Sequence, residues 1–337
     1  MTKVLHIADS QADDTRHRIL TLADNKSEEF DIEVILHKGS SLTPLLKQRG
    51  VKYHELPLSM WAIRRKIKEL KPDIVHTHGT LSGRIAARLY GRCKIVHTPS
   101  SPVTRKMRHR MFCDRIIAVS PSVKNVLQKA GVSERKISLV YDGVSPAWKY
   151  SAEQSLNFRR KYNVPQNAFV VTYIAPLSEE NHNYVLDTAR ELPFNVCILI
   201  VGTGEYEAHL KNRINKERLA NVRMISPLSD LDELLAMANA QMDVSYMPET
   251  VSLPLLAGLS VGRPAIVTER APYVIENGIS GLVIPPHDPE VLDDAITRLK
   301  DDPKMYKQLS EGAAARYKQF TAAKMTAETE SIYNELS

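Results

Sequence analysis

The strongest candidate for a chemical role in this sequence is a glutamate that precedes a predicted helix. Met242–Met247 is rich in apolar residues and predicts a strand, and Glu249 follows it. A helix is expected over Leu253–Val261, because Pro254 suits a first helical turn and Gly262 suits a helix end. If the sheet is parallel, Glu249 and the free N–H groups of the helix start lie at its carboxyl edge, where ligands of open α/β folds bind. The glutamate could bind a hydroxyl group or a developing positive charge there, or be an ordinary solvated side chain.

Three shorter motifs carry the residue types of metal or phosphate sites, but their spacing is less specific. Asp230-Leu231-Asp232 precedes a predicted helix and is interpreted as an N-cap cluster. His76-x-His78 could seat a metal ion, yet the sequence offers no further ligand set beside these two histidines at a strand end. Gly202-x-Gly204 is half of a phosphate loop, without a third glycine or a lysine. We therefore predict no metal site and no resident cofactor.

The elements that position these residues alternate between strand and helix along the chain. Most of the strand-length runs are continuous in Val, Ile and Leu, as strands buried on both faces must be. Helical patterns separate them, which predicts parallel, doubly wound sheets. The predicted strands are Val4–Ala8, Ile32–His37, Val51–Leu56, Ile74–His78, Lys94–His97, Arg115–Ser120 and Ile137–Tyr141, then Phe169–Ala175, Val196–Val201, Val222–Ile225, Met242–Met247, Ala265–Thr268 and Leu282–Ile284.

Chain length favours two domains, because 337 residues exceed one typical core. A polar, charged stretch, Lys149–Asn167, separates the two series of strands. We predict a Rossmann-like domain over residues 1–150 and a second one over residues 165–319, which face each other across a cleft. The C-terminal helix, residues 320–337, is expected to pack back on the first domain.

The composition, 43% apolar and 25% charged, is that of a soluble globular protein. No run of about 18 apolar residues exists, and the chain start lacks the apolar region of a signal peptide. Cys93, Cys113 and Cys197 are odd in number, far apart and in apolar surroundings, so they are expected to be reduced thiols. These features predict a cytoplasmic protein.

Positive charge is concentrated in the first half of the chain. Residues 1–150 hold 27 lysines and arginines against 14 acidic residues, whereas the remainder is net acidic. Such a surface attracts polyanions, which favours an anionic membrane surface or a phosphorylated acceptor over a merely solvated face. Nucleic acid is not expected, because aromatic interleaving and recognition modules are missing. The basic residues cluster in Arg64–Lys68, in Arg84, Arg88, Arg92 and Lys94, and in Arg105–Arg110.

Two such domains, with Glu249 and its helix in the second, resemble the GT-B glycosyltransferases, and specifically the retaining family 4 (glycosyl transferases group 1). The resemblance covers nearly the whole chain, and the order and spacing of its segments make it specific. The matching segments are Lys71–His78, Ile95–Thr98, Asp114–Ser122, Tyr141–Val144, Leu199–Gly204 and Gly278–Pro285.

This resemblance implies an enzyme that moves a sugar from a nucleotide-diphosphate sugar to a lipid-linked or cell-envelope polysaccharide or lipopolysaccharide acceptor. Retention of anomeric configuration and independence of metal are implied with it. The basic first domain further predicts a peripheral location on the inner face of the membrane. The implied catalytic residues are Glu249, beside the donor sugar, and His97, which approaches from the first domain; a core histidine is the alternative for His97. The implied donor-binding residues are Thr250, Val251, Ser252, Leu253, Gly202, Gly204, Ser226 and Pro227.

The sequence departs from the family's pattern around the donor phosphates. Asp9–Asp14 replaces a loop that normally contains paired glycines. Pro176 and Asn181 stand where an arginine and a lysine reach the pyrophosphate, and Ala257 stands where a glutamate binds ribose. These losses support a second hypothesis, a non-catalytic relative with a degenerate donor site that acts as a binding or partner subunit for an active transferase.

Overall fold

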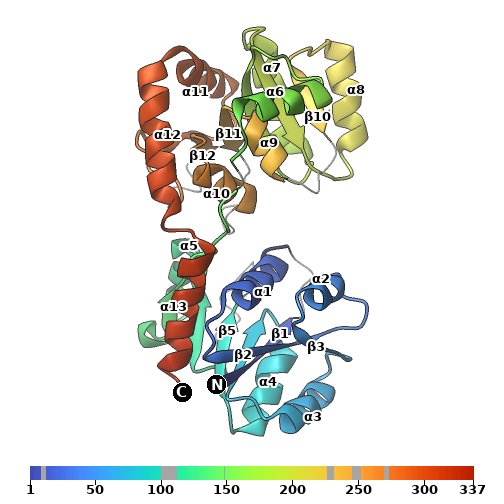
Figure 1. Cartoon of the computed structure of the whole chain (residues 1–337), viewed down its shortest axis with the longest axis vertical. Helices are drawn as coiled ribbons and strands as arrows, with labels where there is room; N and C mark the ends of the chain where they lie inside the picture. The colour runs from blue at the N-terminus through green and yellow to red at the C-terminus, as the bar shows by residue number, and fades with distance from the viewer. Residues whose placement is uncertain (9–12, 100–111, 148, 226–230, 245–251, 269–272) are drawn as a thin grey trace. The chain divides into compact units, whose positions relative to one another are not determined.

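The computed structural model describes residues 1–8, 13–99, 112–147, 149–225, 231–244, 252–268 and 273–337 (Figure 1). The chain divides into two compact units, Met1–Val144 with Gln319–Ser337 (unit 1) and Ser145–Lys318 (unit 2). Each unit is built on an open parallel sheet, and the order of the strands in each sheet reverses once. The predicted pair of Rossmann-like doubly wound sheets is therefore confirmed.

Unit 1 contains a seven-stranded sheet in the order β3-β2-β1-β4-β5-β6-β7. The reversal lies between β1 and β4, and ligands of open α/β folds bind outside the carboxyl ends of the strands at such a point. Every strand predicted for this half of the chain is present, with ends within two residues of the prediction. The strands are β1 (Thr2–Ala8), β2 (Phe30–Leu36), β3 (Lys52–Glu55), β4 (Ile74–His78), β5 (Lys94–Thr98), β6 (Arg115–Ala118) and β7 (Ile137–Leu139).

Helices cover both faces of this sheet, because successive side chains of each buried strand point to opposite faces. Val4 of β1 packs in one core with residues of α1 and α13, whereas Leu5 packs in a second core with residues of α3, α4 and α5. Most of the predicted helix Val103–Phe112 lies outside the described residues. The described helices are α1 (Asp13–Asn25), α2 (Thr43–Gln48), α3 (Met60–Leu70), α4 (Leu81–Tyr90), α5 (Pro121–Lys129) and α13 (Ala322–Asn334).

The last helix, α13, is fixed to unit 1 by backbone contacts before it begins. Val144 donates its N–H to the carbonyl of Phe320 and accepts from Ala322 N, at 2.9 and 3.0 Å. A Cβ atom at Gly143 would lie 2.3 Å from the carbonyl oxygen of Thr321, so only glycine permits this approach. The helix then packs beside α1, with Tyr333 fully buried.

Unit 2 contains a six-stranded parallel sheet in the order β10-β9-β8-β11-β12-β13, with its reversal between β8 and β11. The strands are β8 (Phe169–Ile174), β9 (Val196–Val201), β10 (Val222–Ile225), β11 (Ala240–Asp243), β12 (Ala265–Thr268) and β13 (Gly281–Ile284). The helices of this unit are α6 (Ala152–Lys161), α7 (Glu179–Glu191), α8 (Glu207–Glu217), α9 (Leu231–Met237), α10 (Leu253–Ser260), α11 (Pro289–Asp301) and α12 (Pro303–Tyr317).

The stretch interpreted as a polar separator contains a helix, α6. A capping box starts it, since Ser151 and Gln154 each accept a hydrogen bond from the other's backbone. Near its end, the guanidinium of Arg159 donates to the carbonyls of Gln166, Ala168 and Met237 and to the Asn239 side chain. Hydrogen bonds of this buried arginine therefore make the stretch part of unit 2.

The strand predicted over Met242–Met247 begins two residues earlier, at Ala240. Pairing with β8 decides this start, because Ala240 lies opposite Val171 and Asn239 donates its N–H to Val170 O. The predicted helix Asp232–Ala240 correspondingly ends at Met237. Among the residues that the structure describes, no helix has both the length and the apolar character that crossing a membrane requires.

Candidate functional site

The reversal point of the unit 2 sheet is hollowed. A small surface hollow lies there, where the carboxyl halves of β8 and β11 meet the first turn of α10. Polar groups and apolar side chains share its lining, as in ligand sites of this architecture. The lining residues are Thr172, Ile174, Gln241, Met242, Ser252, Pro254 and Leu255.

The first turn of α10 adds an electrostatic preference for anions to this hollow. Ser252 is the N-cap, and its hydroxyl accepts the N–H of Leu255 at 3.4 Å. Pro254 has no N–H and Leu256 N donates to Ser252 O, so the N–H groups of Ser252 and Leu253 carry the positive end of the helix dipole. Ser252 and Leu253 are the predicted donor-binding residues that the structure places here. The predicted residues Glu249, Thr250, Val251, Ser226 and Pro227 lie outside the described residues, and their roles stay predictions.

Gln241 of β11 holds α10 against the sheet. Its side-chain amide donates to the carbonyls of Leu255 and Arg263, at 3.0 and 3.3 Å. A Cβ atom at Gly258 would lie 2.1 Å from Gln241 Oε1, so glycine permits the helix to lie this close. Ala257, which stands where the family has a ribose-binding glutamate, is buried in the same helix.

The turn between β8 and α7 presents neutral polar groups where the family has two cations. Pro176 is exposed and Asn181 is half-buried. Among the described atoms, Asn181 Oδ1, Ser178 Oγ and His182 Nε2 are buried without a hydrogen-bond partner. Burial lowers the pKa of His182 to about 4, so this imidazole is neutral at physiological pH. The turn can therefore offer hydrogen bonds to a ligand, but not the charge of the missing arginine and lysine.

Gly202 and Gly204, both predicted to bind the donor, have a structural role in this turn. A Cβ atom on Gly202 would lie 2.0 Å from Ala175 O, and one on Gly204 would lie 2.4 Å from Leu177 O. Leu177 N also donates to Thr203 O at 2.9 Å. The two glycines thus let the loop after β9 pack directly on the β8–α7 turn.

In unit 1, His97 lies on β5 and is fully buried. Its Nδ1 lies 2.9 Å from Thr77 Oγ1 and 3.1 Å from Thr77 O, and its Nε2 has no partner among the described residues. Burial, and then the nearby Arg84 cation, lower the pKa of His97 to about 3. The ring is therefore neutral and covered by protein here, and contact with a donor sugar stays a prediction.

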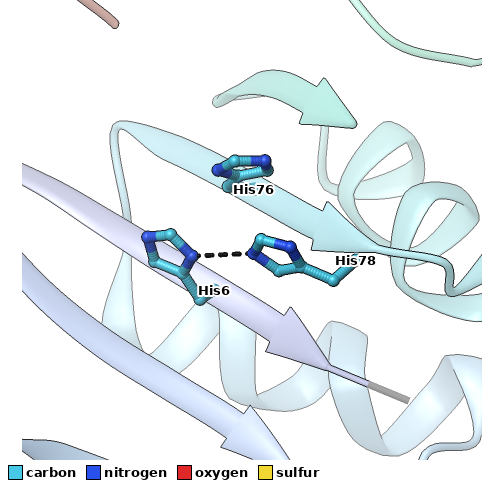
Figure 2. Close-up of side chains that lie close together, drawn as sticks. All are labelled: His6, His76 and His78. Carbon is cyan, nitrogen blue, oxygen red and sulfur yellow. Dashed lines mark hydrogen bonds between the residues drawn. The ribbon is translucent and has the colours of Figure 1, made fainter. Parts of the chain in front are cut away.

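Three other histidines meet on the opposite face of the same sheet, at the reversal point of unit 1. His6 of β1 pairs in register with His76 of β4, and His78 is the next residue of β4 on that face. All three are fully buried, and His6 Nδ1 lies 2.9 Å from His78 Nε2 (Figure 2). The sequence showed two of these histidines as a possible metal pair, but their third neighbour comes from a strand seventy residues away.

A buried ion pair borders this histidine cluster. Arg18 of α1 makes two hydrogen bonds of 2.8 Å to the Asp142 carboxylate, and both side chains are buried. Burial, the neighbouring imidazoles and the Arg18 cation lower the pKa of His76 and His78 well below the usual value. Burial alone lowers the pKa of His6 to about 3. The cluster therefore consists of neutral rings.

Comparisons with known proteins agree with this architecture. The family model of glycosyl transferases group 1 matches residues 154–316, and that of glycosyltransferase family 4 matches residues 4–148. The crystal structure of the Anabaena protein HepE in complex with UDP superposes with a TM-score of 0.88, at 17% identity, over 99% of this chain and 100% of that one. The protein is a glycosyltransferase of the GT-B fold.

Relatives of this glycosyltransferase extend along most of its length. An uncharacterised glycosyltransferase of Methanocaldococcus jannaschii is 23% identical over 96% of this chain and 91% of its own. The Escherichia coli UDP-Gal:α-D-GlcNAc-diphosphoundecaprenol α-1,3-galactosyltransferase is 25% identical over 82% of this chain and 81% of its own. These matches to transferases do not favour the alternative of a non-catalytic subunit.

Proposed function

We propose that this glycosyltransferase takes its sugar from a nucleotide-diphosphate sugar bound at the carboxyl edge of unit 2. The observation that carries this proposal is the hollow between β8 and β11, with the N-terminus of α10 at its rim. A helix N-terminus favours the phosphates, and the hollow offers the hydroxyl group of Ser252. The complex of HepE with UDP and the UDP-Gal donor in the name of the E. coli relative support a uridine nucleotide as the first candidate.

Glu249 is proposed to stabilise positive charge near the anomeric carbon of the donor sugar. It comes three residues before the N-cap Ser252 in the chain. Such electrostatic stabilisation is often the largest contribution to catalysis. We propose transfer with retention of anomeric configuration and without a metal ion in the transfer step, as the resemblance to family 4 implies.

The acceptor is proposed to be a saccharide linked to a lipid diphosphate or to the cell envelope, at an anionic membrane surface. The name of the E. coli relative, which acts on a diphosphoundecaprenol-linked sugar, supports this class. A basic face formed by α3 and α4 of unit 1 supports membrane contact, because α3 and α4 pack side by side. We define this α3–α4 face by the exposed cations on the two helices and just after them, Arg65, Lys68, Lys71, Arg88 and Arg92, and the exposed acidic residues Glu69 and Asp73 lie in the same segments.

Two exposed apolar side chains accompany these charges, Trp61 at 67% and Leu89 at 49% exposure. Aromatic and aliphatic groups beside basic residues are typical of helices that lie on a bilayer. Arg84, which the sequence placed in this basic cluster, is instead buried and does not belong to the face. The predicted basic segment Arg105–Arg110 lies outside the described residues.

Calorimetric titration with UDP, GDP, ADP and CMP, in buffer that contains EDTA, tests the donor site. We expect micromolar binding of one nucleotide, and tighter binding of its sugar-linked form. Glu249→Ala should leave nucleotide affinity nearly unchanged and abolish the gain from the sugar, whereas Glu290→Ala, an exposed glutamate on α11, should change neither. No binding of any of these nucleotides at millimolar concentration would refute the proposal.

Flotation with vesicles tests the membrane contact. Vesicles that contain anionic lipid should bind the protein, and neutral vesicles should not. Each cation contributes about 1 kcal/mol near an anionic surface, so Arg65→Glu and Lys68→Glu should each weaken binding at least about fivefold. Lys304→Glu, an exposed position in unit 2, is the matched control. Equal binding by all three variants would show that the α3–α4 face does not contact the membrane.

A further inference from the structure

The histidine cluster of unit 1 has the composition and the burial of a metal site. Figure 2 shows the rings of His6 and His78 edge to edge, with the His76 ring lying over them. One ring nitrogen from each histidine lies within 4.8 Å of those of the other two. The cluster also occupies the reversal point between β1 and β4, where parallel sheets bind ligands.

Two buried ring nitrogens of the cluster have no hydrogen-bond partner among the described residues. Only one proton lies between His6 Nδ1 and His78 Nε2, because both rings are neutral. Whichever ring donates, the outer nitrogens His6 Nε2 and His78 Nδ1 have no partner among the described residues, although both are buried. Unpartnered buried groups of this kind are rare, and bound water is one established explanation for them. Such waters would also accept the protons that the outer nitrogens carry when the inner nitrogens bind an ion.

We propose that His6, His76 and His78 bind a divalent transition-metal ion such as Zn²⁺, as a structural part of unit 1. A Zn–N bond of about 2.0–2.1 Å and a tetrahedral angle place two ligating nitrogens about 3.4 Å apart. The 2.9 Å separation of His6 Nδ1 and His78 Nε2 therefore opens by about half an ångström, and the two nearly parallel rings turn so that both nitrogens face the ion. The proton that the two rings share moves to an outer nitrogen, so every ligand stays a neutral imidazole.

The His76 ring is fixed by hydrogen bonds at both nitrogens and stacks on the His78 ring, with centroids 4.3 Å apart and 30° between the planes, so the ring has to turn before Nε2 faces the ion. Its Nδ1 lies 2.6 Å from the hydroxyl of Tyr333 on α13, and its Nε2 lies 2.8 Å from Thr98 Oγ1. The ion would take Nε2 from Thr98, while Nδ1–H continues to donate to Tyr333. A hydrogen bond from the ring N–H that does not bind the metal orients a ligating histidine and raises its affinity for the metal.

The surroundings favour an ion that prefers nitrogen. The described cluster contains no carboxylate or thiolate, which disfavours Ca²⁺ and Mg²⁺ and leaves ions that imidazole binds well. The Arg18 cation acts on His76 and His78, and its bidentate contact with Asp142 offsets the arginine's charge. Because the rings are neutral at physiological pH, the metal does not have to displace protons in order to bind.

Titration of the chelator-stripped, full-length protein with Co²⁺ tests the proposal, since the visible absorption of Co²⁺ reports nitrogen ligation and coordination number. We expect one equivalent to bind with a four-coordinate spectrum, from three imidazoles and one water, and Zn²⁺ to displace it. His6→Gln and His78→Gln should weaken binding at least about a hundredfold. His97→Gln, a change of another buried histidine on the opposite face, should leave the affinity unchanged.

Tyr333→Phe provides a graded variant if a ligand substitution fails to fold. Loss of the hydroxyl that holds His76 should weaken the metal about 10- to 100-fold with the same spectrum. The proposal is overturned if the folded wild type binds no Co²⁺ or Zn²⁺, or if both ions bind His6→Gln and His78→Gln as tightly as wild type. Because nucleotide binding is measured in EDTA, the donor site and the metal site can fail independently.

Discussion

Mild acid should destabilise unit 1 more than unit 2, and the buried histidines set the size of the effect. Four histidines of unit 1, His6, His76, His78 and His97, have a pKa lowered by burial. In the unfolded chain each returns to a pKa of about 6.5. As the pH falls below that value, the unfolded state binds protons that the folded state does not. The free energy of unfolding that these neutral histidines contribute is therefore fully present above about pH 6.5. It decreases as the pH falls, until His6 and His97 also protonate in the folded state near pH 3.

The magnitude follows from linkage. Between pH 7.5 and 5.5, a histidine that stays neutral when folded loses about 1.4 kcal/mol of stability. Four such groups give an upper value of about 5–6 kcal/mol, which is comparable to the whole stability of a typical domain. In unit 2, His182 is the described histidine with a lowered pKa, and it accounts for one loss of about 1.4 kcal/mol.

Chemical denaturation at the two pH values, with EDTA present to exclude metal ions, measures this loss. The variant His97→Gln removes one of the four titrating groups, whose ring contacts Thr77 and lies near the Arg84 cation. The variant is expected to be less stable than wild type at pH 7.5. Its further loss on going to pH 5.5 should nevertheless be about 1.4 kcal/mol smaller than that of wild type.

The test compares the free energy of unfolding that wild type and His97→Gln lose between pH 7.5 and 5.5. If wild type and His97→Gln lose the same free energy between pH 7.5 and 5.5, then His97 is not held neutral by burial. If wild type loses less than about 1.4 kcal/mol in total, the whole account of the buried histidines is refuted.

Three further substitutions test the contacts that position the two sheet edges. Arg18→Met should cost about 3–5 kcal/mol, since it leaves the Asp142 carboxylate buried and unpaired, and adding Asp142→Leu should recover much of the loss in denaturation experiments. Gly202→Ala should cost more than about 2 kcal/mol, because its Cβ would overlap Ala175 O; a variant as stable as wild type would contradict the tight loop packing. Arg159→Met should expose α6 to proteolysis while unit 1 stays intact, and cleavage at wild-type rate would argue against its anchoring role.

Strand-length apolar runs separated by helical patterns were enough to predict both sheets. Strands buried on two faces leave a continuous apolar signal, and for this reason all seven strands of unit 1 were found within two residues. The helix α6 was missed because its residues are mostly polar, although Ser151 and Gln154 carried the signature of a capping box. The start of β11 was misplaced because pairing with β8, rather than local sequence, decides where it begins.

The candidate sites show the same division. The sequence located the first turn of α10, since Ser252, Pro254 and Gly262 mark the two ends of that helix by local chemistry. It could not show that Gly202 and Gly204 meet backbone atoms of another loop, because a glycine looks the same beside a ligand and beside a carbonyl group. It also placed Arg84 on the basic surface, although this side chain is buried.

By itself the sequence determined the alternation of elements, the two parallel sheets and the location of the glutamate and helix start in the second half. These properties depend on near neighbours in the chain, on periodicity and on capping. Only the tertiary structure decided which strands lie side by side, and so which distant side chains meet. His76 and His78 became a three-histidine cluster because the sheet places β1 next to β4, and His97 was separated from them because side chains alternate between the two faces of a strand.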